Sequence, residues 1–90
     1  MATARDVAEW MVTQVSAGIR LYQKRSVRLI RANFGEEFSY ENENRNLAIS
    51  KEVLDEFEKL APADKVKWVL GKRYWRLARE GDPEGRSVKR

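Results

Sequence analysis

The chain contains neither cysteine nor histidine, the two residues that most often stabilise very small proteins by forming disulfides or binding zinc. Disulfides are excluded, and a structural zinc site lacks its preferred ligands. Catalysis by a Ser-His-Asp or Cys-His arrangement is excluded as well. The 90 residues, of which 42% are hydrophobic, must therefore fold as one small domain around a modest apolar core.

Positive charge is concentrated in two segments without any acidic residue, at positions 20–31 and 65–79. Positions 36–58, which lie between them, are predominantly acidic. The net charge of +4 therefore understates the local potential, and this sorting favours an anionic partner. The second basic segment also interleaves aromatic residues with basic ones, a composition that suits contacts with phosphates and bases.

Apolar residues with helical spacing predict three helices, at positions 4–16, 24–33 and 51–60. Thr3 and Asp6 have the spacing of a capping box at the first helix. The second helix is amphipathic, and its solvent face carries only positive charge. Lys24, Arg28 and Arg31 lie on that face, and Arg25 lies to the other side.

Short alternating segments predict β-strands elsewhere in the chain. Positions 38–40 and 47–49 flank an asparagine-rich turn and predict a hairpin, and positions 19–21 predict one further short strand. These elements together predict an α+β domain resembling a winged helix, with three helices and one or two hairpins. We expect it to span positions 1–80.

A second hairpin is predicted at positions 66–70 and 73–77, where Gly71-Lys72 offers a two-residue turn. A short helix at positions 73–80 is an alternative for its second half, because periodicity cannot separate the two over so few residues. Positions 81–90 contain mainly glycine, proline and charged residues, so we expect a disordered tail there.

The aromatic residues of the second hairpin divide by face. Alternation places Trp68 with Val66 and Leu70, and a domain of this size needs large apolar side chains in its core. We therefore expect Trp68 and Trp75 to be buried. Tyr74 falls on the opposite face of a strand and is expected to be exposed, where its ring could stack against a base.

Several function classes have little support. The acidic cluster Glu36, Glu37, Glu41 and Glu43 lacks the spacing of a calcium-binding loop, so we expect no metal and no cofactor. No pair of carboxylates belongs to a motif for acid–base catalysis, so we expect no enzyme. No apolar run approaches the ~20 residues of a membrane span, and the N-terminus lacks the apolar stretch of a signal peptide. Cytoplasmic residence is the expectation.

Five short motifs resemble those of a family of small, uncharacterised bacterial and phage proteins. They are Asp6-Val-Ala-Glu9-Trp10-Met11, Leu21-Tyr22-Gln23, Phe34-Gly35-Glu36-Glu37-Phe38, Asn42-Glu43-Asn44 and Arg73-Tyr74-Trp75-Arg76. The resemblance covers about positions 6–79 and implies a domain of unknown function, with no activity or functional residues attached. The order of elements also loosely resembles winged helix-turn-helix domains.

The sequence therefore predicts a small basic protein that binds nucleic acid, with DNA favoured over RNA, as an accessory or regulatory protein of a phage or mobile element. The residues expected to contact nucleic acid are Lys24, Arg25, Arg28, Arg31, Lys67, Lys72, Arg73, Tyr74 and Arg76.

A protein-interaction module is the alternative. The third helix has an acidic outer face, which could dock onto a basic surface of a second copy and form a homodimer or a homo-oligomeric adaptor. The basic segments could likewise dock to an acidic protein partner. The acidic residues of this face are Glu52, Asp55, Glu56 and Glu58.

Overall fold

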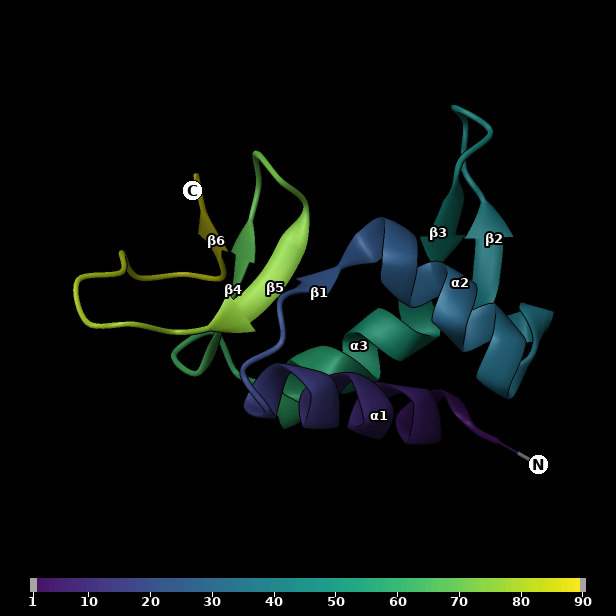
Figure 1. The fold of residues 1–90 in the computed structure, drawn as a ribbon, viewed down its shortest axis with the longest axis horizontal. Helices are drawn as coiled ribbons and strands as arrows, with labels where there is room; N and C mark the ends of the chain where they lie inside the picture. Colours follow the sequence, from purple (N-terminus) through teal and green to yellow (C-terminus); the bar gives the residue numbers. More distant parts are fainter. Residues whose placement is uncertain (1, 90) are drawn as a thin grey trace.

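The computed structural model describes residues 2–89 and has the α+β architecture expected from the sequence, with three helices and several short strands. Figure 1 shows the larger sheet at one end of the molecule, the β2–β3 hairpin at the other, and the helices between and below them. In chain order the elements are α1 (Ala4–Ser16), β1 (Leu21–Tyr22), α2 (Gln23–Phe34), the 3-10 turn η1 (Glu36–Phe38), β2 (Ser39–Glu41), β3 (Leu47–Ile49), α3 (Lys51–Leu60), β4 (Val66–Val69), β5 (Tyr74–Leu77) and β6 (Ser87–Val88).

The three helices form where the sequence predicts them, because their ends are set by local contacts. At the start of α1, the Asp6 amide donates to Thr3 Oγ1 (3.2 Å) and the Thr3 amide donates to Asp6 Oδ2 (2.8 Å), which confirms the capping box. Gly35, with φ +112°, ends α2. Ser50 caps α3 by accepting a hydrogen bond from the Val53 amide.

The larger sheet has the strand order β1-β5-β4-β6. β5 is antiparallel to both β1 and β4, whereas β6 is parallel to β4. The hairpin expected at positions 66–77 is therefore confirmed, and the helical alternative for its second half is wrong. The short strand expected at positions 19–21 forms at Leu21–Tyr22 instead.

The turn of this hairpin is longer than predicted. Val69 pairs with Tyr74, so four residues connect the strands rather than two. The Arg73 amide donates to the Val69 carbonyl oxygen (2.8 Å), and Arg73 itself takes the left-handed conformation, with φ +55°. The turn therefore closes through Arg73, and the predicted Gly71-Lys72 turn does not form.

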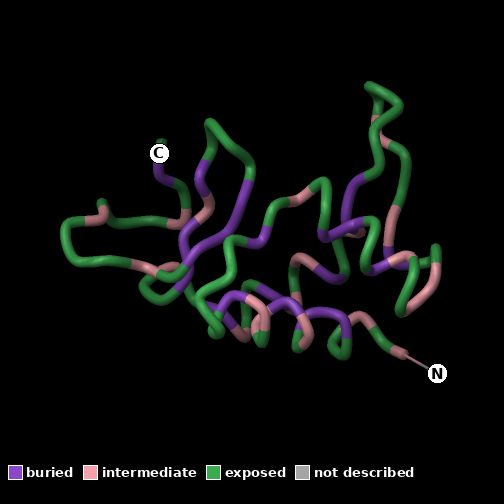
Figure 2. The backbone as a smooth tube through the Cα atoms, in the orientation of Figure 1, coloured by how far each residue is buried: buried purple, intermediate pink, exposed green. Residues whose placement is uncertain are grey.

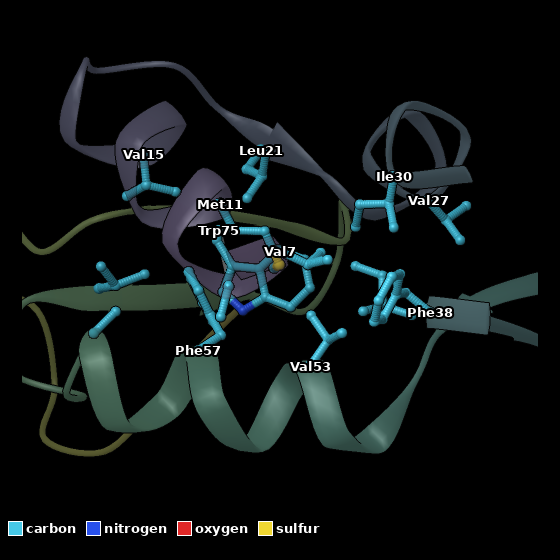
Figure 3. Packing of buried hydrophobic residues seen from close by; sticks show 14 residues of the cluster. Val7, Met11, Val15, Leu21, Val27, Ile30, Phe38, Val53, Phe57 and Trp75 are labelled. Carbon is cyan, nitrogen blue, oxygen red and sulfur yellow. The ribbon is translucent and has the colours of Figure 1, made fainter. Parts of the chain in front are cut away.

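The main core lies between α1, α3 and one face of the larger sheet, and it extends to α2 through Val27 and Ile30 (Figure 3). The ring of Phe57 meets the ring of Trp75 edge-on, with centroids 5.5 Å apart. Trp68 packs against Trp75 at 4.4 Å between centroids. Trp75 is buried and Trp68 is half-buried against the core, as expected from the alternation of the strand.

Positions 81–89 do not form the disordered tail that the sequence predicts. β6 joins the sheet, where the Trp68 amide donates to the Arg86 carbonyl oxygen and the Leu70 amide donates to that of Val88, both at 2.8 Å. Val88 is buried against Val69 and Tyr74 in a second, smaller apolar cluster. We call residues 79–89 the C-terminal strap; position 90, the last of the predicted tail, lies outside the described residues.

Among residues 2–89, no helix has the length and apolar character needed to cross a bilayer.

Candidate functional site

A groove opens at the start of α2, between the loops of the two hairpins. Figure 1 shows the β4–β5 loop and the β2–β3 loop extending on either side of the first turn of α2, and Figure 2 shows that both loops are exposed. The groove has a volume of about 560 Å³. Five cations and no carboxylate line it, and we call it the basic groove. The cations are Lys24, Arg28, Arg45, Lys72 and Arg73.

Helix α2 and the β4–β5 loop hold four of the five cations. Lys24 and Arg28 are four residues apart on α2, so they lie on the same helical face. Lys72 and Arg73 belong to the β4–β5 loop. The Gln23 amide donates to the Arg73 carbonyl oxygen (3.0 Å), which ties this loop to the first turn of α2. Cations more than forty positions apart in the sequence therefore share one surface.

The β2–β3 loop supplies the fifth cation. Arg45 has φ +62°, a left-handed conformation that the loop supports through Asn42. Asn42 Oδ1 accepts hydrogen bonds from the amides of Asn44 (2.9 Å) and Asn46 (3.0 Å). Asparagine thus orders the loop as the sequence suggests, and the ordered loop presents Arg45 to the groove.

The positive charge of the groove is not neutralised by any acidic side chain in the described part of the chain. All five cations are exposed, and within residues 2–89 none of them forms a salt bridge. The first turn of α2 contains no acidic residue, and Tyr22 does not cap it through its side chain. The positive end of the helix dipole therefore adds to the potential of the cations, and an anion bound here would relieve their mutual repulsion.

Two predicted site residues on α2 lie outside the groove. Arg25 is exposed beside a small hollow lined by Trp10 and Ile19. The charge of Arg31 is paired, because its Nη2 donates to Glu36 Oε1 (3.0 Å) and its Nη1 donates to Ser39 Oγ (2.9 Å). Arg31 therefore holds α2 to the turn that follows it.

Three further predicted residues, Lys67, Tyr74 and Arg76, are buried and cannot reach a phosphate or a base. They share one face of the sheet, because Lys67 pairs with Arg76 and Tyr74 pairs with Val69. The sequence indicates that this face is open to solvent, but the C-terminal strap covers it. Lys67, only 4% exposed, donates from Nζ to the carbonyl oxygens of Pro83 (3.0 Å) and Gly85 (2.6 Å).

Arg76 holds the strap through a paired carboxylate. It is 8% exposed, and its Nη1 and Nη2 donate to the two oxygens of Asp82 at 2.9 and 2.8 Å. The hydrogen bonds from Arg76, with one from the Arg79 amide, hold the pKa of Asp82 well below its usual range. The same hydrogen bonds to Asp82 raise the pKa of Arg76, against the opposing effect of burial. Burial also lowers the pKa of Arg86, which donates to the Val66 carbonyl oxygen.

Acid should loosen the strap. Because the pKa of Asp82 is lower in the folded protein than in the unfolded chain, its stabilising effect is complete above the unfolded pKa of about 4 and is lost progressively below it. We expect Asp82→Asn to lower Tm at pH 7, and the Tm difference from the unchanged protein to shrink as pH falls below about 4. Calorimetry between neutral and acid pH measures this difference, and a constant gap would contradict the role of the ion pair.

The acidic cluster considered as a metal site is dispersed. Glu36 pairs with Arg31, and within residues 2–89 no group of three or more acidic side chains is placed to hold a metal ion.

Among the groove residues that sequence reasoning missed are its fifth cation, Arg45, and its aromatic ring, Tyr22. Arg45 lies in a predominantly acidic segment, just after Glu41 and Glu43, yet neither acid lines the groove. Tyr22 stands at the junction of β1 and α2, where only the pairing of β1 with β5 brings it beside Tyr74. The basic run that begins at Arg20 was the one available signal for Tyr22.

Comparison with known proteins places most of the chain within a family. The family model that matches the chain spans residues 3–77, from the N-cap of α1 to the end of β5, and therefore includes all five cations. Comparisons with curated proteins and with solved structures gave no match. The chain belongs to a family of unknown function (DUF6953), in agreement with the resemblance of its motifs to those of uncharacterised proteins.

Proposed function

We propose that the protein binds nucleic acid through the basic groove. The observation that carries the proposal is the convergence of five exposed cations from three separate segments on one concave surface, where residues 2–89 supply neither a salt-bridge partner nor a carboxylate. A nucleic acid backbone presents closely spaced phosphates, and cations that neutralise them release condensed counterions. The flexible side chains of lysine and arginine are suited to such a repeating anion.

The position of the cations also favours a polymer over a single small anion. Lys24 and Arg28 lie on α2, whereas Arg45 lies on the loop at one side and Lys72 on the loop at the other (Figure 1). In this proposal α2 and the β4–β5 loop occupy the places of the helix and the wing in winged-helix domains, but their cations contact the nucleic acid backbone rather than base edges in a groove of a duplex. The same proposal includes a regulatory role in a bacterium or a phage, because a protein that binds nucleic acid can act as a regulator.

A titration at two salt concentrations tests the proposal. If all five cations contact phosphates, the log–log dependence of affinity on salt has a slope of about −4.5 for duplex DNA and about −3.5 for a single strand. Between ~50 and ~200 mM salt, affinity then falls by roughly 100-fold or more. Fluorescence anisotropy with labelled duplex DNA, single-stranded DNA and RNA measures this slope. No binding at ~50 mM salt, or binding that salt leaves unchanged, would refute the proposal.

The rival function is a protein-interaction module that uses the acidic face of α3. Glu52, Asp55 and Glu58 are exposed, and no residue of α3 lines the basic groove. The acidic face of one copy could therefore dock on the groove of another, and such head-to-tail contacts need not close into a dimer. Light scattering separates the two functions: a mass that rises with protein concentration at low salt supports association, whereas a monomer that shifts only with added nucleic acid supports the proposed function.

A further inference from the structure

We infer that the nucleic acid is single-stranded in the basic groove and that the ring of Tyr22 stacks against one of its bases, an inference that rests on the proposed function. Tyr22 lines the groove beside Lys24 and is 38% exposed, a large fraction for a tyrosine that also packs against another ring. An aromatic ring among unpaired cations is the combination that proteins use to bind single strands, because the cations follow the backbone and the ring takes a base.

The ring of Tyr22 is supported from beneath. Tyr22 and Tyr74 are partners across β1 and β5, and their ring centroids are 4.9 Å apart at an interplanar angle of 46°. Tyr74 is 4% exposed, and the guanidinium carbon of Arg20 lies 5.3 Å from the centroid of its ring. Tyr22 therefore rests on a buried ring that Arg20 also contacts, and holding it in place costs little additional side-chain entropy when a base binds.

The ring that is available for stacking differs from the one expected from the sequence. The alternation of β5 indicates that Tyr74 is the exposed ring, but Tyr22, Arg20 and the Val69–Val88 cluster cover it. Tyr22 is the last residue of the two-residue strand β1 and the N-cap of α2, and it lines the groove. The ring that a base can reach is thus Tyr22, and Tyr74 is its support.

The shape of the site favours an unpaired strand over a duplex. In a duplex the faces of the bases are covered by their neighbours, so a tyrosine ring can stack only on a base that is unpaired or flipped out. The first turn of α2 also lies between the two hairpin loops, which extend past it in Figure 1. A helix that reads the major groove must project from its surroundings, whereas a flexible strand can follow a recessed surface.

Substitution of Tyr22 tests the inference separately from the proposed function. Tyr22→Leu keeps an apolar side chain on Tyr74 but removes the aromatic face. We expect it to weaken binding of a short oligothymidine by about 5- to 150-fold, with the slope against salt unchanged because no phosphate contact is lost. Tyr22→Phe should bind within about twofold of the unchanged protein, since the ring is retained. Both variants should bind duplex DNA with the same affinity as the unchanged protein.

An abasic oligonucleotide of the same length provides a control that needs no variant. The unchanged protein should bind it about as weakly as Tyr22→Leu binds oligothymidine, and this result would stand even if Tyr22→Leu failed to fold. If Tyr22→Leu binds oligothymidine as well as the unchanged protein does, or if the abasic strand binds equally well, the stacking inference is wrong. Salt-dependent binding in that case would still support the groove, whereas no salt-dependent binding at all would reject both.

Discussion

Reversing the charges of Arg28 and Arg73 together is expected to lower the affinity for nucleic acid by at least about 100-fold at low salt. The two residues come from α2 and from the β4–β5 loop, and both are exposed cations of the basic groove. The double variant loses two phosphate contacts and gains two carboxylates that repel the backbone. The slope of log affinity against log salt should become less steep by about 1.8 for a duplex or 1.4 for a single strand. Anisotropy titrations across salt give both quantities.

A matched variant separates the groove from net charge. Lys51→Glu with Lys65→Glu changes the net charge of the protein by the same amount, and both lysines are exposed and lie outside the groove. The affinity of this control for nucleic acid should be within a few-fold of that of the unchanged protein, and its slope of log affinity against log salt should be the same. Equal weakening by the two double variants would mean that net charge rather than the groove attracts the nucleic acid, and the proposed site would be wrong. Because all four residues are on the surface, neither variant is expected to lose its fold.

The helices could be predicted from the sequence because their signals are local. Thr3 with Asp6, Ser50 and Gly35 each act within four residues, so the sequence order alone brings the partners together. The turn at Leu70–Arg73 was harder to predict, because its conformation depends on a positive φ at Arg73, a conformation that glycine usually supplies. The strap was missed for a different reason: apart from the ion pair of Arg76 with Asp82, its contacts are long-range and involve backbone carbonyls, which composition does not reveal.

The candidate site could be predicted only in part, because the sequence shows where charge is concentrated but does not show which side chains are buried. Runs of charge are visible in the sequence, and four of the nine predicted residues, Lys24, Arg28, Lys72 and Arg73, do line the groove. Alternation correctly placed Tyr74 and Arg76 on the same face of β5, but which face is covered depends on a segment that returns from Asp82 onward. Periodicity thus gives the relative direction of side chains within a strand, whereas their burial depends on the rest of the fold.

Ending the chain at Arg79 is expected to produce the largest loss of stability among these changes. The truncation removes β6 and Val88, and with them the carbonyl oxygens that accept from Lys67. Burial of one valine side chain contributes about 1.5–3 kcal/mol, so a fall in Tm of roughly 10 °C or more follows for a domain of this size. A chain that ends at Val88 keeps all of these contacts and should melt within a few degrees of the full chain.

The same truncation should weaken binding, because the strap supports the groove from behind. Val88 packs against Val69 and Tyr74, and Tyr74 in turn supports Tyr22. Val69 also accepts the hydrogen bond that closes the loop carrying Lys72 and Arg73. Loss of the strap would therefore loosen the stacking ring and two of the five cations at once. At a temperature where the truncated chain is still folded by circular dichroism, its affinity for oligothymidine should be lower than that of the chain ending at Val88. Equal affinities would show that the groove keeps its shape without the strap.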